Sequence, residues 1–531
     1  MEITQKFKNS VRFFAGESLT KKASLNALTV ALDYGARLLV GFVITPFMVL
    51  GLGQYFFGTW QVLNRMVSYI SPSSGRPTQA LKWTIARDQT SNDYVQKQQF
   101  VGSAIIVWII FLPLMILLGG ILVWQLPYWL KAAPEHFLPI RLCSGILVAN
   151  LALTGLTHIP SSVLQGENLG YKRMGLTTST VLLGGGLVWL ALHLGMGIVG
   201  VAAAAMTTTV LTGTVFLLIV RRNTPWFKIS FPPFRQTRKF FVLSSWFLGW
   251  NLVMKLMTAS DVVILGFLKS VESVTDYTLL KYAPETLISL IALTNLGIAP
   301  GLGGIIGSGQ LKKAANIRGE MLSITWLVTT ALGASILVWN RTFLVLWVGP
   351  GHYVGPFAAF FITLVVTQFV VIRSDVGIID LSLDLRSKVL LGLLSAAAAI
   401  VLASLLVGYF DLGVIGICIG LIMGRFVLSV GYPSIIGRLL GLSIFSQLRS
   451  SLRPALVTIL LYLFATWIQS YMHLGDESGL LRWVYFVLGA GITAGVFLAA
   501  AFYSGLSGRQ RKIITGRLRS VYSPESRQER T

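Results

Sequence analysis

Long apolar runs, separated by short charged, proline-rich or glycine-rich segments, follow one another along the whole chain. A helix that crosses the hydrocarbon core of a bilayer needs about 20 apolar residues, and each run reaches that length. The pattern therefore predicts about fourteen membrane-spanning helices, which we number 1 to 14 in chain order. They cover residues 24–50, 53–72, 100–124, 139–163, 173–194, 196–220, 240–266, 274–298, 320–346, 353–374, 386–408, 411–433, 453–473 and 480–505.

The composition indicates the same class of protein. The 531 residues are 54% hydrophobic, and only 12% are Asp, Glu, Lys or Arg. A soluble domain has about 25% charged residues, so a soluble enzyme is excluded and an all-α integral membrane protein is expected. The two cysteines, Cys143 and Cys418, lie inside apolar runs, which predicts neither a disulfide framework nor a cysteine metal site.

Positive charge is distributed unevenly between the connections. The chain has 43 Lys and Arg against 20 Asp and Glu, a net charge of +23. If the N-terminus is cytoplasmic, most basic residues fall on that side, including the runs Arg76–Lys97 and Arg221–Lys239 and the tail from Arg509. The positive-inside rule then predicts a cell (inner) membrane protein with both termini cytoplasmic. The charge reflects topology, so we expect no nucleic-acid partner and a tail that binds anionic membrane lipids.

A glycine-containing pattern opens two of the predicted helices. Gly-Ile-Val-Gly-Val begins at Gly197 and Gly-Val-Ile-Gly-Ile at Gly413, 216 residues later. The same shift moves helix 1 onto helix 7, which predicts two six-helix lobes related by a pseudo-two-fold axis along the membrane normal, plus a C-terminal helix pair. The predicted domains are 1–222 for the N-terminal lobe with helices 1–6, 223–239 for a cytoplasmic linker, 240–438 for the C-terminal lobe with helices 7–12, and 439–531 for helices 13–14 and the basic cytoplasmic tail.

Ionisable residues well inside the predicted spans are concentrated on helices 1, 2, 7 and 8. Each costs about 2.5–3.5 kcal/mol near the bilayer centre, so each should face protein, water or a partner. Under the 216-residue shift, helix 1 corresponds to helix 7 and helix 2 to helix 8, whereas the other ten helices contribute essentially Arg425 alone. The seven residues are Asp33, Arg37, Arg65, Lys255, Asp261, Lys281 and Glu285.

Polar residues at helical spacing extend these charges into stripes. Residues three or four apart share a helix face, so each of the four helices is predicted to have one wet face, and together the faces predict a polar cavity. The uncharged cavity residues are Asn26, Asn64, Asn251 and Tyr277.

For two of the charged pairs, an ion bridge within one helix explains the spacing as well as a cavity does. The two pairs are Asp33–Arg37 and Lys281–Glu285. Arg65 and Lys255 have no acid at that spacing, which favours a position facing the cavity.

Searches for catalytic patterns are negative. The five histidines are scattered without metal-ligand spacing, and the glycine-rich stretches lack the Lys-Ser/Thr ending of a phosphate loop. No external connection is longer than about fifteen residues, whereas membrane glycan polymerases and ligases use a large external loop. We therefore expect no enzyme activity, no metal site and no cofactor.

Three local segments resemble one transporter family. Pro46–Gly51 followed by Tyr55–Trp60 resembles the link between helices 1 and 2 in the polysaccharide (oligosaccharide) flippases of the multidrug/oligosaccharidyl-lipid/polysaccharide exporter superfamily. Ser260–Gly266, leading to Tyr277, resembles the counterpart between helices 7 and 8, and Ser162–Asn168 resembles the end of helix 4. Two six-helix lobes and a terminal pair match this family over nearly the whole chain.

The resemblance implies alternating access around a central cavity lined by helices 1, 2, 7 and 8. The cargo would be a lipid-linked oligosaccharide on a polyprenyl-pyrophosphate carrier, moved from the cytoplasmic to the outer leaflet for cell-surface polysaccharide biosynthesis. Arg binds phosphate through its planar fork and Lys acts as a mobile point charge, so the candidate head-group residues are Arg37, Arg65, Lys255 and Lys281. The acids that could couple transport to H⁺ or Na⁺, or simply line the cavity, are Asp33, Asp261 and Glu285.

Three other functions stay open. A multidrug exporter of the same superfamily usually has twelve helices and a cavity richer in acids than bases, whereas here four cations face three acids. A peptidoglycan-precursor exporter shares the fourteen helices and the cationic cavity, but its helix 1 signature is not found here. A membrane glycan polymerase or ligase lacks its external loop. Expected partners are the lipid-linked glycan, membrane lipids and other glycan-assembly membrane proteins.

Overall fold

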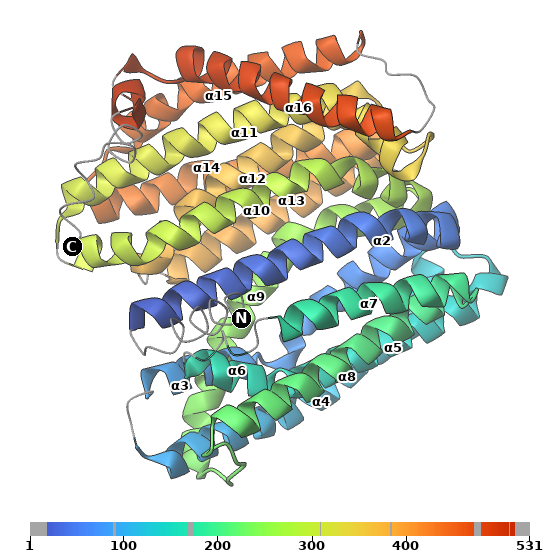
Figure 1. The fold of residues 1–531 in the computed structure, drawn as a ribbon, viewed down its shortest axis with the longest axis vertical. Helices are drawn as coiled ribbons and strands as arrows, with labels where there is room; N and C mark the ends of the chain where they lie inside the picture. Colours follow the sequence, from blue (N-terminus) through green and yellow to red (C-terminus); the bar gives the residue numbers. More distant parts are fainter. Residues whose placement is uncertain are drawn as a thin grey trace, which may run out of the picture. The chain divides into compact units, whose positions relative to one another are not determined.

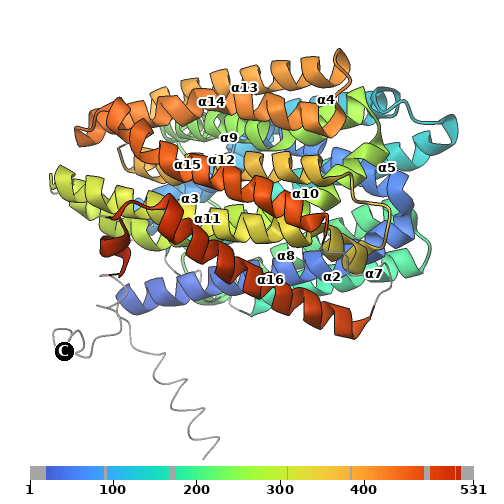
Figure 2. The same cartoon turned by 90° about the horizontal axis from the view of Figure 1, so that it is seen from above.

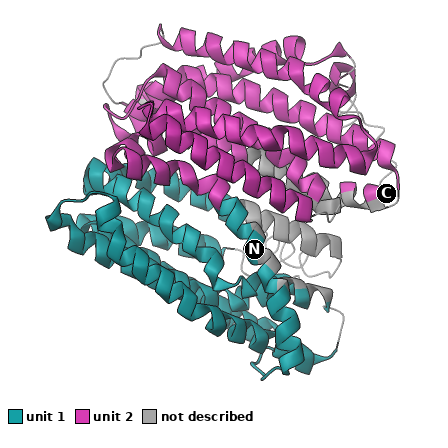
Figure 3. Cartoon of the chain, turned by 180° about the vertical axis from the view of Figure 1, so that it is seen from behind, with its two compact units in different colours: residues 1–255 teal, residues 256–531 magenta. Residues whose placement is uncertain are grey.

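The computed structural model describes residues 19–88, 92–167, 169, 172, 175–307, 309–382, 385–471, 479–508 and 510–515. Every regular element in these ranges is helical (Figure 1). The chain divides into two compact units, residues 1–255 and 256–531 (Figure 3). The division falls inside the long helix α9, beyond the linker expected at 223–239. The four-part domain division and the symmetry axis stay predictions.

Unit 1 contains long helices and several short ones that continue or connect them. Its elements are α2 (Leu19–Ile70), the 3₁₀ turn η1 (Ser71–Ser74), α3 (Pro77–Arg87), α4 (Tyr94–Trp129), the 3₁₀ turn η2 (Pro134–His136), α5 (Phe137–Thr157), α6 (Ile159–Gly166), α7 (Leu176–His193), α8 (Gly197–Asn223) and the first part of α9 (Phe234–Leu268).

Unit 2 consists of the rest of α9 and seven further long helices. These are α10 (Val271–Gly307), α11 (Leu311–Val348), α12 (Pro356–Ser382), α13 (Leu385–Gly408), α14 (Gly413–Leu440), α15 (Ile444–Gln469) and α16 (Leu480–Ala500), and a π-helical turn (Ala501–Gly505) follows the last of them.

Twelve helices among the described residues are long and apolar enough to cross a bilayer. One of them, Leu32–Ser74, includes the expected helices 1 and 2 in a single run. The helix α10 overlaps the expected helix 8, and α5 with α6 covers helix 4. All fourteen predicted segments therefore coincide with helices, and the expected all-α, multi-pass membrane protein is confirmed.

Glycine separates the first two spans. The backbone of Gly53 has φ 72° and ψ 169°, while the residues on both sides are helical. This conformation is essentially restricted to glycine, because a Cβ atom would clash with the backbone. Helices 1 and 2 thus follow each other directly along α2 and meet at a kink at Gly53.

Close helix packing in unit 2 depends on small residues. The helices α13 and α14 run side by side in both views (Figures 1 and 2). A Cβ atom added to Gly424 would lie 2.3 Å from the Ala399 backbone, and one added to Gly420 would lie 2.4 Å from Ala403. Lipid tails are as apolar as the helix surfaces, so the hydrophobic effect does not drive helix association in a membrane. Close backbone packing of this kind holds the helices together instead.

The opposite face of α13 carries apolar side chains that the described part of the chain does not cover. Leu390, Leu394, Val401 and Leu405 are each more than half exposed. Their spacing places them on one face of the helix. This face is suited to contact with lipid tails, as expected of a membrane-spanning helix.

Candidate functional site

Polar side chains of α9 and α10 form a buried ion-pair cluster in unit 2. Lys281 Nζ lies 2.5 Å from Asp261 Oδ2 and 2.9 Å from Glu285 Oε1. The Tyr277 hydroxyl donates a hydrogen bond to the same Asp261 oxygen over 2.8 Å. Tyr277, Lys281 and Glu285 recur every four residues on α10, so one helix face presents all three to Asp261.

Arg425 of α14 joins this cluster. Its Nη2 donates to the Met257 carbonyl of α9 over 2.8 Å, and its guanidinium carbon lies 4.7 Å from the centre of the Phe369 ring. Its charge also acts on Asp261 and Glu285. The sequence marked Arg425 as an isolated charge, because only the folded chain brings its side chain to the Met257 carbonyl.

The unit 2 cluster is balanced in charge. Asp261 and Glu285 face Lys281 and Arg425, and all but Glu285 are buried. Desolvating an ion costs several kcal/mol, which such mutual pairing offsets. The Glu285 side chain is 41% exposed, so it is the member most open to the surroundings. The Lys281 ammonium, a predicted head-group residue, is thus already held by two carboxylates.

Unit 1 holds a different arrangement, three positive charges grouped without acids. The charges of Arg65 on α2 and Arg76 before α3 both act on Lys255 of α9. Within the described ranges, none of the three forms an ion pair. Arg65 and Lys255, two of the predicted site residues, therefore interact through their charges, and Arg76 adds a third charge.

Arg76 was not selected from the sequence because it lies in a connection rather than in a helix. It follows Gly75 and precedes Pro77, and its own φ of 51° is left-handed. Its Nε is buried and has no hydrogen-bond acceptor in the described part of the chain. Burial lowers the pKa of the guanidinium, which nevertheless stays charged since an arginine is not deprotonated in proteins.

The predicted asparagines differ in their contacts. Asn251 lies one turn before Lys255, and its Oδ1 is buried without a donor among the described residues. Asn64 instead donates to the Trp60 carbonyl of its own helix over 2.8 Å. The side chain of Asn26 lies outside the described residues. Asn251 is therefore an amide with an unused acceptor one helical turn from Lys255.

Asp33 and Arg37 do not form the intrahelical bridge that their spacing allows. Asp33 is buried, and its Oδ1 accepts a hydrogen bond from Thr178 of α7 over 3.2 Å. Arg37 is exposed and makes no ion pair within the described residues. The bridge forms only in the second pair, between Lys281 and Glu285.

Two further ion pairs, which the sequence did not indicate, each join two distant segments within one unit. In unit 1, Lys97 Nζ lies 3.0 Å from Glu167 Oε1. In unit 2, Arg318 binds Asp375 through two bonds of 2.9 Å and also donates to Gln447. Each partner is distant in sequence, so no local spacing could have revealed these pairs.

Long apolar helices with charged residues buried among them define a multi-pass membrane protein. The sequence model of the family described as polysaccharide biosynthesis protein matches residues 25–298, more than half of the 531 residues. The chain therefore belongs to the polysaccharide biosynthesis protein family, in agreement with the local resemblances. No curated protein sequence matches the chain.

Solved structures share the fold at low sequence identity. The lipid II flippase MurJ, in an inward closed conformation, is 13% identical with a TM-score of 0.63, covering 90% of this chain and 98% of that one. An inward-facing multidrug resistance MATE family transporter of the MOP superfamily is 17% identical with a TM-score of 0.58, covering 81% of this chain and 97% of that one. The chain thus shares the fold of these two structures.

Proposed function

We propose that this protein is a flippase for a lipid-linked oligosaccharide of the polyprenyl-pyrophosphate type. It moves the glycan from the cytoplasmic to the outer leaflet by alternating access, as a step in cell-surface polysaccharide biosynthesis. Membership of the polysaccharide biosynthesis protein family supports this substrate class. The fold shared with transporters of the MOP superfamily is compatible with the transport mode.

The cationic group of unit 1 is the observation that carries the proposal. Arg65, Arg76 and Lys255 are three charges near one another without a carboxylate among the described residues. Uncompensated cations in an apolar bundle need water or an anionic ligand. A pyrophosphate supplies several oxygens for the two arginine forks and the lysine ammonium. Arg37, exposed on α2, is a further candidate contact.

The proposal also includes Lys281 and the two carboxylates that bind its ammonium. In the structure its ammonium is bound to Asp261 and Glu285. Protonation of Glu285, the more exposed of the two acids, would leave Asp261 as the remaining carboxylate on the ammonium, so that an anion could take the place of Glu285. Proton or sodium coupling through Asp33, Asp261 or Glu285 is therefore part of the proposal, and no organic cofactor is involved.

The proposed setting is the cell (inner) membrane with both termini cytoplasmic. Proposed partners are the lipid-linked glycan, membrane lipids and other glycan-assembly membrane proteins, with no nucleic acid. The basic asymmetry of the connections supports this orientation.

Reconstituted vesicles test the function directly. Purified protein is incorporated with a fluorescently labelled polyprenyl-pyrophosphate oligosaccharide, and the fraction of label reaching the opposite leaflet is measured. The proposal predicts protein-dependent movement with unchanged glycan length. Longer glycan chains would instead indicate a polymerase or ligase. Movement of lipid II alone would indicate the peptidoglycan-precursor exporter, and movement of organic cations alone the multidrug exporter.

A further inference from the structure

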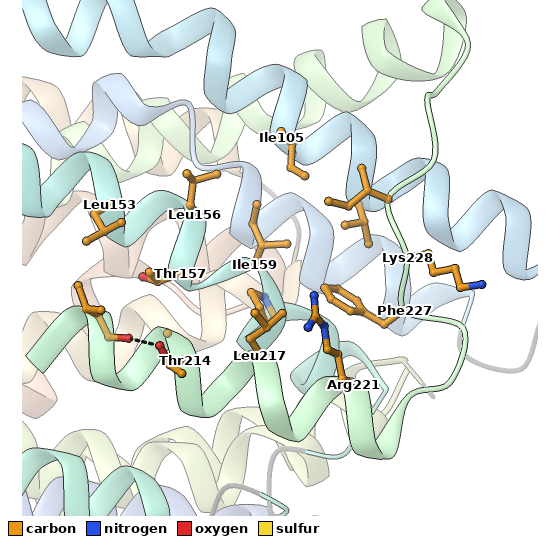
Figure 4. Close-up of a pocket in the computed structure, with 15 residues that line it drawn as sticks. Ile105, Leu153, Leu156, Thr157, Ile159, Thr214, Leu217, Arg221, Phe227 and Lys228 are labelled. Carbon is orange, nitrogen blue, oxygen red and sulfur yellow. Dashed lines mark hydrogen bonds between the residues drawn. The ribbon is translucent and has the colours of Figure 1, made fainter.

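An apolar groove opens on unit 1 between α5 and α8 (Figure 4). It has a volume of about 740 Å³, within the range of small-molecule sites. Its walls are mainly aliphatic, and Val101 and Ile159 at its base are almost fully buried. Val210 is 45% exposed and Ile229 is 68% exposed along its rim, so the groove is accessible from outside the bundle.

Two cations stand at one end of this groove. Arg221 lies in the last turn of α8, and Lys228 belongs to the segment that follows this helix. Figure 4 shows the Arg221 guanidinium beside the Phe227 ring, with Lys228 further along the same end. Both side chains are exposed, and neither has an ion-pair or hydrogen-bond partner in the described part of the chain. The groove is thus apolar along its length and positively charged at its end.

The charged end is built into the fold because the segment after α8 is fixed against α4. The Gln98 side chain donates to the Trp226 carbonyl over 3.0 Å. Gly102 of α4 leaves no room for a side chain, since a Cβ atom there would lie 2.1 Å from the Ser230 carbonyl oxygen. These contacts bracket Phe227, Lys228 and Ile229, so the end of the groove exists before any ligand arrives.

We propose that this groove binds an anionic phospholipid of the surrounding membrane. One acyl chain lies along the aliphatic walls and is held there by van der Waals packing, because the surrounding lipid provides no hydrophobic driving force. The phosphate lies at the charged end and interacts with Arg221 and Lys228. Basic pockets between membrane helices at the membrane surface suit such head groups. None of these residues belongs to the Arg65, Arg76 and Lys255 group, so the site is separate from the proposed cargo site.

Native mass spectrometry of the full-length protein, after removal of co-purified lipid, measures the binding. The probes are dioleoyl phosphatidylglycerol, dioleoyl phosphatidylcholine and inorganic phosphate. Arg221→Gln/Lys228→Gln removes both cations from the groove. Arg222→Gln/Arg235→Gln removes two exposed cations that do not line it and is the matched control. Thr214→Trp fills the groove from its exposed side.

Wild-type protein should bind phosphatidylglycerol more tightly than phosphatidylcholine. The Arg221→Gln/Lys228→Gln variant should bind phosphatidylglycerol about 30-fold more weakly, from the usual contribution of two surface cations. The control variant should stay within about twofold of wild type, and Thr214→Trp should weaken both lipids. Size-exclusion profiles confirm that each variant is folded.

Three results would overturn the lipid site. One is that the Arg221→Gln/Lys228→Gln variant and the control variant bind phosphatidylglycerol with equal affinity. A second is inorganic phosphate binding as tightly as the lipid, since this would define a plain anion site. The third is polyprenyl phosphate displacing phosphatidylglycerol at equal concentration, because the groove would then serve the cargo rather than a membrane phospholipid.

Discussion

Positive charges without a carboxylate partner are costly in a membrane-embedded bundle, and Arg65, Arg76 and Lys255 of unit 1 interact with one another through such charges. The charges of unit 2 are instead paired within their own cluster. Removing a charge should therefore have opposite consequences in the two places. It should relieve repulsion in unit 1 and leave a buried ion without its partner in unit 2.

Arg65→Gln and Lys255→Gln should leave folding intact and reduce glycan export to background. Arg65→Lys should restore activity only in part, because the bidentate fork is lost while the charge remains. The measurement is transbilayer movement of labelled lipid-linked oligosaccharide, normalised to folded protein in the membrane. Arg222→Gln, an exposed cation at the end of α8, is the control. Unchanged normalised activity in both glutamine variants would remove the cationic group from the mechanism.

Lys281→Met should destabilise unit 2 by about 3–5 kcal/mol, the usual effect of breaking a buried ion pair. The cause is Asp261, which is 3% exposed and would lose its nearest cation. Asp261→Asn/Lys281→Met should recover part of the loss, since no unpaired carboxylate remains at that position. Equilibrium unfolding in detergent measures the difference in free energy of unfolding.

The Lys269–Asp411 pair offers a matched control for this cycle. The same residue types meet there, but the Asp411 side chain is 83% exposed. Lys269→Met should change the free energy of unfolding by only about 0–1 kcal/mol, as for other surface pairs. If Lys281→Met and Lys269→Met lowered the free energy of unfolding equally, burial would not set the strength of the unit 2 cluster.

At the scale of helices, the sequence located the elements well because bilayer thickness fixes their length. The glycine patterns from Gly197 and Gly413 do open α8 and α14. The boundary predicted between helices 1 and 2, at residues 50–53, does coincide with the break at Gly53. The sequence did not locate the change from α5 to α6 at His158, where the predicted helix 4 is uninterrupted.

Contact between α13 and α14 gives a prediction at this scale. Gly424→Ala should destabilise the protein by about 1–3 kcal/mol, since its Cβ atom would lie 2.3 Å from the Ala399 backbone, which cannot move aside as a flexible side chain can. Gly495→Ala in α16 is the control, because no atom lies within 4 Å of its added Cβ. Thermal unfolding in detergent measures both. A loss in the control as large as in Gly424→Ala would contradict the packing argument.

For the molecule as a whole, the sequence could select site residues but not their partners. Four-residue spacing predicted the Lys281–Glu285 contact, because helical geometry alone brings such residues together. The Asp261–Lys281 bond and the Arg425 contact join different helices, so they depend on tertiary packing. The sequence did not indicate Arg76, because it lies in a connection and not inside a predicted span.

Membrane orientation is the last prediction, and α4 provides the test because connections at its two ends are both described. Its 36 residues extend about 54 Å, so the chain before Tyr94 and the chain after Trp129 lie at opposite ends of a span. Phe231 is 87% exposed just after Ser230, which contacts α4 near its start. Ala133 is exposed beyond the end of the same helix.

The basic run Arg221–Lys239 should therefore be cytoplasmic and the Ala133 connection external, as the positive-inside rule requires. In intact cells, a membrane-impermeant maleimide should label Ala133→Cys and leave Phe231→Cys unreacted until the membrane is permeabilised. The native thiols of Cys143 and Cys418 are buried, so the unsubstituted protein gives the background. Labelling of Phe231→Cys but not Ala133→Cys in intact cells would invert the orientation, and with it the predicted cytoplasmic position of both termini and the proposed direction of transport.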